Sequence, residues 1–267
     1  MGSVLVCYSG GVDSALLLAV AHRVLGERAI GMTAVSPSLA EAERETAIAI
    51  AGQIGARHAI VYSHEIEREA YAANGTDRCF HCKSELYAIA SKKREEWGLA
   101  WIANGTNLDD LGDYRPGLQA AETSGVRSPF VEVGWGKSRV RQAAERLGLS
   151  VWNKPAAACL ASRLPYGTRV TRDRLRRIAA LESDLRAMGL RQVRVRIHPL
   201  HPGEEEQADR AIARIEVGQA ELEHAFALRE GIAQAGKLHF AYVTLDLEGY
   251  RIGSPNEVID RKKLPLV

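Results

Sequence analysis

The sequence lacks a strong excess of charge of either sign. Its 267 residues include 35 basic and 33 acidic side chains, which gives a formal net charge of +2. Proteins that bind nucleic acid usually present a strongly basic face, so the composition argues against that class. The chain also shows no apolar run of transmembrane length and no basic, apolar leader at its start, from which we expect a cytoplasmic protein without membrane partners.

Cysteine is scarce, with four residues in the whole chain, and there is no internal repeat or low-complexity tract. In a chain expected to stay in the cytoplasm, so few thiols favour metal binding or catalysis over structural disulfides. Cys7 lies in an apolar run, where we expect a small buried side chain. The candidates for chemistry are therefore Cys79, Cys82 and Cys159.

The most informative segment is the hexapeptide S-G-G-V-D-S at residues 9–14. It follows an apolar run at 4–8 that predicts a buried strand and precedes a helical pattern at 15–25. Glycines let the backbone approach a phosphate, and the N–H groups and dipole of a helix N-terminus favour negative charge. The segment therefore predicts a phosphate site, in which Asp13 orients the loop or holds Mg²⁺.

Two common phosphate motifs are excluded, because neither a Gly-Lys-Ser/Thr sequence nor the G-x-G-x-x-G spacing is present here. The hexapeptide instead resembles the PP-loop of the N-type ATP pyrophosphatases. Members of that superfamily cleave ATP to AMP and pyrophosphate and adenylate an oxygen of their substrate. The resemblance implies that ATP binds at Ser9, Gly10, Gly11, Asp13 and Ser14.

Apolar runs alternate with helical patterns through the first part of the chain. This alternation predicts an α/β fold with a parallel sheet, helices on both of its faces, and a ligand site at the carboxyl ends of the strands. The expected strands are residues 4–8, 29–34, 58–61 and 100–103, and the expected helices are 15–25, 39–54, 84–97 and 137–147.

The composition changes at residues 153–170, which carry Pro155, Pro165 and Gly167 and little periodicity. We expect a PP-loop domain at 1–154, an ordered connection with Cys159 at 155–170, and a small α/β domain for substrate binding or oligomerisation at 171–267. In this last domain a helix is expected at 172–188 and another near 219–234. Strands are expected at 192–198, 212–217 and 238–247, and the first alternates cleanly between apolar and basic residues.

The C-x-x-C pair, Cys79 and Cys82, has several interpretations by itself. It fits a redox dithiol, half of a zinc site or two ligands of an iron–sulfur cluster. Together with Cys159, three thiolates suit a [4Fe–4S] cluster whose fourth iron can hold an exogenous sulfide. Persulfide chemistry without metal, a zinc site and inert thiols remain alternatives at this point.

A more specific resemblance covers nearly the whole chain. The chain is similar to the LarE-type ATP-dependent sulfur transferases, which sulfurate the pyridinium mononucleotide precursor of the nickel-pincer cofactor. The segments that carry this resemblance are residues 8–14, 77–83 (D-R-C-F-H-C-K), 104–110 (N-G-T-N-L-D-D), 113–117 (D-Y-R-P-G), 137–141, 152–167, 193–196 (V-R-V-R), 213–217 and 242–254.

This resemblance implies that ATP adenylates a carboxylate and that Cys159 lies at the sulfur-transfer centre. Members with one cysteine give up its sulfur and keep dehydroalanine, whereas members with three, as here, are thought to use a [4Fe–4S] cluster. The resemblance also implies a homo-oligomer, a sulfide or cysteine-desulfurase source, and nucleotide contact at Gly105. The implied substrate-site residues are Lys83, Asp110, Ser162, Arg163, Glu182, Arg194, Arg196, Arg214 and Glu216.

The residue pattern supports some of these roles independently. Arg194 and Arg196 share one face of an expected strand, so both can reach one substrate phosphate, the alternative being a solvated face. Lys83 suits a phosphate or an adenylate, or is a surface lysine. Asp109 and Asp110 suit Mg²⁺ or a helix cap.

Two other functions fit part of the pattern. A tRNA thiolase of the same superfamily also combines an ATP loop with three cysteines, but the near-neutral charge argues against it. A protein that senses ATP without turnover, with structural cysteines, is the alternative that is not an enzyme. Release of pyrophosphate in the presence of a carboxylate substrate distinguishes it from the sulfur transferase.

Overall fold

The computed structural model describes residues 1–112, 116–155, 157–200 and 210–251. The segments 113–115 and 252–254, which carry part of the family resemblance, lie outside these residues. The chain forms two compact units, Met1–Ala158 and Cys159–Val267. Among the described helices, none combines the length and apolar character needed to cross a membrane.

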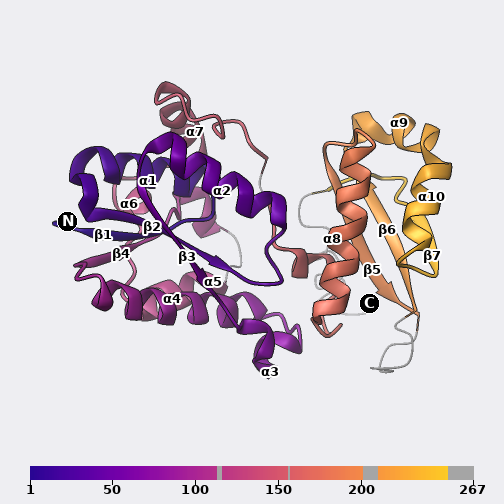
Figure 1. Ribbon diagram of the computed structural model, residues 1–267, viewed down its shortest axis with the longest axis horizontal. Helices are drawn as coiled ribbons and strands as arrows, with labels where there is room; N and C mark the ends of the chain where they lie inside the picture. Colours follow the sequence, from indigo (N-terminus) through magenta and orange to yellow (C-terminus); the bar gives the residue numbers. More distant parts are fainter. Residues whose placement is uncertain (113–115, 156, 201–209, 252–267) are drawn as a thin grey trace, which may run out of the picture. The chain divides into compact units, whose positions relative to one another are not determined.

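The first unit is built on a parallel four-stranded sheet with the order β3-β2-β1-β4 (Figure 1). The alternation of apolar runs and helices had predicted this parallel sheet, which is confirmed. Each strand lies within two residues of its expected bounds. The strands are β1 (Val4–Cys7), β2 (Ala29–Val35), β3 (Arg57–Tyr62) and β4 (Trp101–Ala103).

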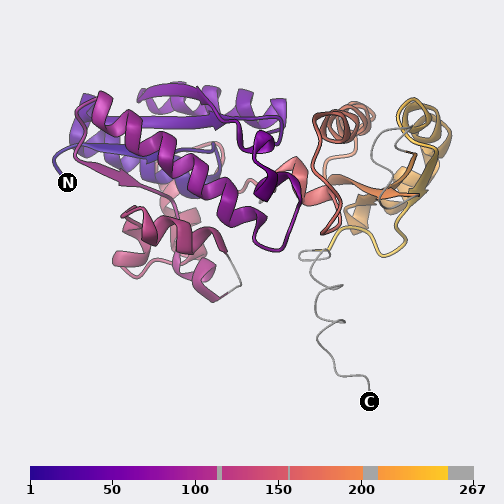
Figure 2. The same ribbon diagram turned by 90° about the horizontal axis from the view of Figure 1, so that it is seen from below.

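Helices cover both faces of this sheet, as expected. Helices α1 and α2 lie on one face and α4 and α5 on the other, with α4 running across the strands in Figure 2. Central strand β1 is apolar at successive positions because Val4 and Val6 pack into the first core and Leu5 into the second. The helices are α1 (Val12–Leu25), α2 (Glu41–Ile54), α3 (Glu69–Ala72), α4 (Arg78–Glu96), α5 (Pro116–Thr123), α6 (Pro129–Glu132) and α7 (Lys137–Arg146).

Helix α4 begins at Arg78, six residues before the expected start at residue 84. A tertiary contact explains the difference, because the buried Arg78 guanidinium donates to Asn74 Oδ1 at 2.5 Å. This contact fixes the first turn, which the periodicity alone could not show. The C-x-x-C pair therefore lies inside the helix and not before it. The short helices α3, α5 and α6 were also missed, since they carry too few turns for a periodic signal.

The second unit contains a three-stranded mixed sheet with the order β5-β6-β7, antiparallel between β5 and β6 and parallel between β6 and β7. Helix α8 packs on β5 through a fully buried row that includes Ile178, Leu181 and Leu185. The helix expected near 219–234 is divided at Leu228. The elements are α8 (Arg172–Ala187), β5 (Val193–Pro199), β6 (Ala211–Val217), α9 (Leu222–Ala227), α10 (Arg229–Lys237) and β7 (Tyr242–Leu245), with 3₁₀ turns η1 (Gly26–Arg28), η2 (Glu65–Glu67), η3 (Leu108–Gly112), η4 (Leu160–Arg163) and η5 (Gln219–Glu221).

Candidate active site

The loop that follows β1 has a conformation that requires glycine at its tip. Gly10 has a φ of +73°, and a Cβ atom there would lie 2.8 Å from the Ala47 Cα of α2. Gly11 is the N-cap of α1, with extended backbone angles. The chain thus turns tightly against α2 and delivers the N-terminus of α1, where helical N–H groups without intrahelical partners favour an anion.

Two serine hydroxyls close this loop internally. The Ser14 hydroxyl donates to the Gly11 carbonyl at 3.1 Å and accepts the Ser9 backbone N–H, also at 3.1 Å. The two hydroxyl oxygens, Ser9 Oγ and Ser14 Oγ, lie 3.1 Å apart. This network fixes the conformation of the loop.

Asp13 is held by two groups from other loops. Asn107 Nδ2 donates to Asp13 Oδ1 at 3.0 Å, and the Lys137 ammonium forms an ion pair with Asp13 Oδ2. Lys137 begins α7, and its backbone N–H donates to Asp109 Oδ2 at 2.5 Å. Asp13 therefore joins three segments, namely the loop that follows β1, the segment after β4 and the start of α7.

The segment after β4 approaches the phosphate loop closely. A Cβ atom at Gly105 would lie 2.8 Å from the Ser14 backbone nitrogen, so only glycine permits this approach. Asp110 accepts the Asn107 backbone N–H at 3.1 Å, which closes the start of η3. Asp109 and Asp110 thus both cap backbone N–H groups here, one of the two roles expected from the sequence.

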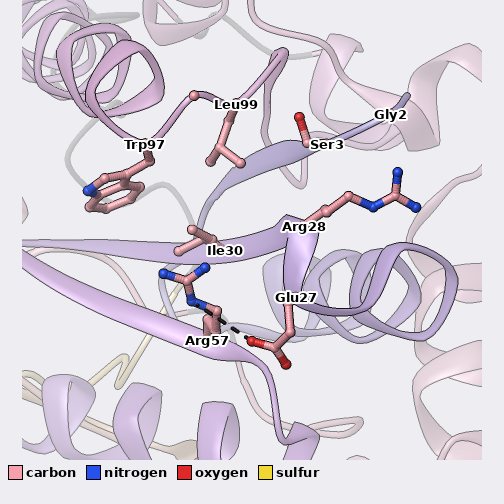
Figure 3. A pocket seen from close by; sticks show the side chains of 9 residues that line it. Gly2, Ser3, Glu27, Arg28, Ile30, Arg57, Trp97 and Leu99 are labelled. Carbon is pink, nitrogen blue, oxygen red and sulfur yellow. Dashed lines mark ion pairs between the residues drawn. The ribbon is translucent and has the colours of Figure 1, made fainter.

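Sheet topology explains why these loops meet. β1 lies between β2 and β4, so the segments after β1 and after β4 leave the same carboxyl edge. A different hollow lies at the opposite, amino edge of the sheet, where Arg28, Ile30, Arg57, Trp97 and Leu99 line it (Figure 3). That hollow holds none of the expected site residues.

The C-x-x-C thiols lie in the first turns of α4. Cys79 is exposed and Cys82 is half-buried, and residues three apart share one face of a helix. Desolvation opposes the charge of Lys83, but Tyr87 and the thiols of Cys82, Cys7 and Cys79 outweigh it and raise the Lys83 pKa. Lys83 thus supplies positive charge beside the two thiols.

Cys7, at the end of β1, differs from this pair. Burial raises the pKa of its thiol to about 12, although the charge of Lys83 opposes that rise. A thiol with so high a pKa is protonated at neutral pH and is a poor nucleophile and metal ligand. The structure thereby separates Cys7 from Cys79 and Cys82.

In the second unit, Cys159 is exposed at the head of the short turn η4. Arg163, at the end of this turn, is buried and donates twice to Glu182, at 2.8 and 3.1 Å. Burial alone would raise the Glu182 pKa, but Arg163, the Val195 N–H and Arg186 outweigh it and hold that pKa below its usual range. Glu182 is therefore a carboxylate with no exposed surface.

A second buried ion pair lies on the strands. Arg196 on β5 donates to both oxygens of Glu216 on β6, at 3.0 and 2.9 Å. Glu216 also pairs with Arg214 at 3.2 Å, and Arg214 forms a further ion pair with Asp246. Removing one partner of such a buried pair typically costs about 3–5 kcal/mol, because the other charge is left without compensation.

Arg194 differs from the other guanidinium groups of this cluster. Its guanidinium carbon lies 4.4 Å from the ring centroid of Tyr250, and in the described part of the chain it contacts no carboxylate. Desolvation and the charges of Arg163 and Arg196 lower the Arg194 pKa. Arg194 is therefore this cluster's candidate for binding an anion.

The structure groups the expected site residues within each unit. Ser9–Ser14, Gly105 and Asp110 lie at one sheet edge, Cys79, Cys82 and Lys83 on α4, and Cys159, Ser162 and the Arg–Glu pairs in the second unit. Over the ranges described, no group of three or more His, Cys, Asp or Glu side chains is placed to hold a metal ion.

Sequence reasoning assigned no role to Asn107 or Tyr250, although both lie in segments of the family resemblance. Asn107 contacts Asp13, and Tyr250 packs on Arg194. No local sequence pattern predicts either contact, because the two residues in each contact come from distant parts of the chain.

Substitution of Gly10 tests the geometry of the loop. We expect Gly10→Ala to weaken ATP binding about 5- to 30-fold, since the strained φ and the contact with Ala47 cost on the order of 1–2 kcal/mol and displace the loop. Equilibrium binding of a non-hydrolysable ATP analogue measures the effect. Gly52→Ala is the matched control, because a Cβ there meets open space within α2. ATP affinity equal to the wild type in Gly10→Ala would contradict the assignment.

No protein-family model matches the chain. Individual relatives do, over nearly its full length. An uncharacterised protein of Synechocystis sp. is 42% identical over 260 residues, 96% of this chain and 93% of that protein. The pyridinium-3,5-bisthiocarboxylic acid mononucleotide synthase of Lactiplantibacillus plantarum is 34% identical over 263 residues, 98% of this chain and 91% of the synthase. An identity at this level over both units shows that the chain belongs to the LarE-type family of sulfur transferases.

Proposed function

We propose that this protein uses ATP to adenylate a carboxylate of a pyridinium mononucleotide and converts it to a thiocarboxylate, a step in nickel-pincer nucleotide synthesis. The likeness to the bisthiocarboxylic acid mononucleotide synthase carries this proposal, because it covers the phosphate loop of one unit and the Cys159 turn of the other. The geometry of the first unit supports adenylation, and that of the second supports substrate binding, while the cysteines proposed for sulfur transfer come from both units.

Adenylation uses the carboxyl edge of the first sheet. The ATP phosphates bind at the N-terminus of α1 and to the Ser9 and Ser14 hydroxyls. A substrate carboxylate oxygen attacks the α-phosphorus, the bond to the pyrophosphate oxygen breaks, and pyrophosphate leaves. Lys137 exchanges its contact with Asp13 for a phosphate, and Asp13 then becomes available to Mg²⁺.

Asp13 is the residue whose loss should stop adenylation. We expect Asp13→Ala to reduce carboxylate-dependent pyrophosphate release by at least about 100-fold, since Mg²⁺ loses its carboxylate and Lys137 loses the ion pair that positions it before ATP binds. The measurement is a coupled pyrophosphate assay, with the melting temperature as a check on folding. Asp173→Ala, an exposed carboxylate on α8, is the matched control. Pyrophosphate release at the wild-type rate in Asp13→Ala would show that the loop assignment is wrong.

Sulfur transfer requires a sulfide nucleophile at the acyl carbon of the adenylate. When it attacks, the bond from that carbon to the AMP oxygen breaks, AMP leaves, and a thiocarboxylate forms. Cys79 and Cys82 present two thiols on one helix face beside Lys83, and Cys159 presents an exposed third. Thiolates are the usual ligands of a [4Fe–4S] cluster, so we propose that Cys79, Cys82 and Cys159 would hold one, which would supply an open iron for a sulfide.

The cluster is tested by single cysteine substitutions. We expect anaerobically purified protein to be brown and to contain roughly four irons per chain. Cys79→Ala, Cys82→Ala and Cys159→Ala should each lose iron and sulfur transfer but keep ATP binding, because thiolate ligands are missing. Cys7→Ala is the matched control and should keep all three properties, since its thiol is protonated.

The sacrificial mechanism makes the opposite forecast for the same proteins. Cys159 alone would then matter, turnover would end at one per chain, and mass spectrometry would find that residue lighter by the mass of H₂S. Colourless protein with that mass loss and a fully active Cys79→Ala variant would reject the cluster and leave adenylation intact.

The substrate phosphate is assigned to Arg194, the guanidinium without a described carboxylate partner. We expect Arg194→Ala to raise the KM for the pyridinium mononucleotide about 10- to 150-fold, the worth of a charge-assisted hydrogen bond of ~1.5–3 kcal/mol. The KM for ATP should stay unchanged. Arg191→Ala, an exposed arginine just before β5, is the matched control. An unchanged substrate KM in Arg194→Ala would mean that the phosphate binds elsewhere.

A further inference from the structure

The turn that presents Cys159 contains little structure of its own. It is four residues of 3₁₀ helix, with Leu160 and Ala161 buried beneath an exposed thiol. Two bonds close it, from the Ser162 N–H to the Cys159 carbonyl at 2.9 Å and from the Leu164 N–H to the Ala161 carbonyl at 3.2 Å. Such a short element needs outside contacts to keep one conformation.

Arg163 supplies the first of these contacts. Its Nε and one terminal nitrogen bind both oxygens of Glu182 on α8. The other terminal nitrogen donates to the Cys159 carbonyl at 3.2 Å and to Ser162 Oγ at 3.2 Å. One planar guanidinium thus joins a helix carboxylate to the backbone of the residue that carries the thiol.

Arg196 repeats this arrangement from the sheet. Two of its nitrogens bind both oxygens of Glu216, and the third donates to the Ser162 carbonyl at 2.7 Å. The carbonyls of Cys159 and Ser162 therefore both accept hydrogen bonds from arginines. A carboxylate fixes the orientation of each of these arginines. A guanidinium held by two parallel bonds has one allowed plane, so its third donor direction is fixed as well.

The two carboxylates are 0% exposed, so a substrate arriving from solvent has no surface of Glu182 or Glu216 to contact. We propose that these glutamates are positioning residues, which act through Arg163 and Arg196 to hold the Cys159 turn for sulfur transfer. This inference rests on the proposed function, but it assigns these residues differently from the substrate-binding role that the family resemblance implies.

Steady-state kinetics separates positioning from substrate binding. We expect Glu182→Gln and Glu216→Gln to lower kcat for thiocarboxylate formation roughly 10- to 100-fold, as expected for a reacting group displaced by about 1 Å. The KM for the pyridinium mononucleotide and the rate of pyrophosphate release should stay within about 3-fold of the wild type, because neither carboxylate contacts substrate or ATP.

A matched control lies in the same cluster. Arg186 donates to Glu182 Oε2 at 2.9 Å but makes no contact with the turn. Arg186→Gln should therefore keep the wild-type kcat. If the glutamine variants fold poorly, Arg163→Lys and Arg196→Lys provide the same test, since lysine keeps the ion pair but cannot bridge carboxylate and carbonyl. These variants should also lose kcat without a change in substrate KM.

Hydrogen exchange tests whether Glu182 and Glu216 hold the Cys159 turn, and it does not require catalysis. We expect the Ser162 and Leu164 amides, which close the turn, to exchange at least about 10-fold faster in Glu182→Gln and Glu216→Gln than in the wild type or Arg186→Gln. Wild-type protein that transfers no sulfur would contradict the proposed function. The exchange rates would still show whether Glu182 and Glu216 hold the Cys159 turn.

Two results would overturn the inference. One is unchanged exchange at the turn together with a wild-type kcat in both glutamine variants. The other is a rise of more than about 10-fold in the substrate KM with kcat unchanged, which would make the glutamates substrate ligands.

Discussion

The pairing of β1 with β4 is the constraint on which the first unit depends. Because both strands run in the same direction and lie side by side, the chain leaves them at one edge, and the segments that follow must share that space. Gly105 makes this sharing sterically feasible, because a Cβ there would overlap the backbone at Asp13 and Ser14, while Gly10 allows the first loop to turn against α2. Asp13, Asn107 and Lys137 then join the converging segments through hydrogen bonds and an ion pair.

The second unit depends on a different interaction, the pairing of buried charges. Guanidinium and carboxylate groups on α8, β5 and β6 are removed from water, which is tolerable only because each makes paired hydrogen bonds. Arginine suits this role better than lysine, since its planar guanidinium donates to both carboxylate oxygens and still has a donor for a backbone carbonyl. The consequence is a network of buried ion pairs that contacts the turn carrying Cys159, whereas Arg194 packs on Tyr250.

Much of the architecture could be predicted from local patterns. Strand and helix periodicity located the parallel sheet, and the alternation at residues 193–198 placed Arg194 and Arg196 on one face of β5. Prediction failed where tertiary contacts decide. Helix α4 begins at Arg78 because that side chain is anchored to Asn74, and no periodic signal in residues 78–83 reports such an anchor. Asp109 and Asp110 could not be distinguished as metal ligands or caps until the N–H groups beside them were located.

The sequence by itself determined which reactive groups the chain contains and on which local elements they lie. These are a glycine-rich turn before a helix, three thiols at informative spacings, and a strand with guanidinium groups on one face. Only the tertiary structure decided how those groups are used. Arg194 and Arg196 are equivalent in sequence, yet Glu216 binds Arg196 although it lies opposite Arg194 in the strand register. Alternation along a strand fixes the face that a side chain occupies, whereas its ion-pair partner depends on side chains from other elements, which no local pattern contains.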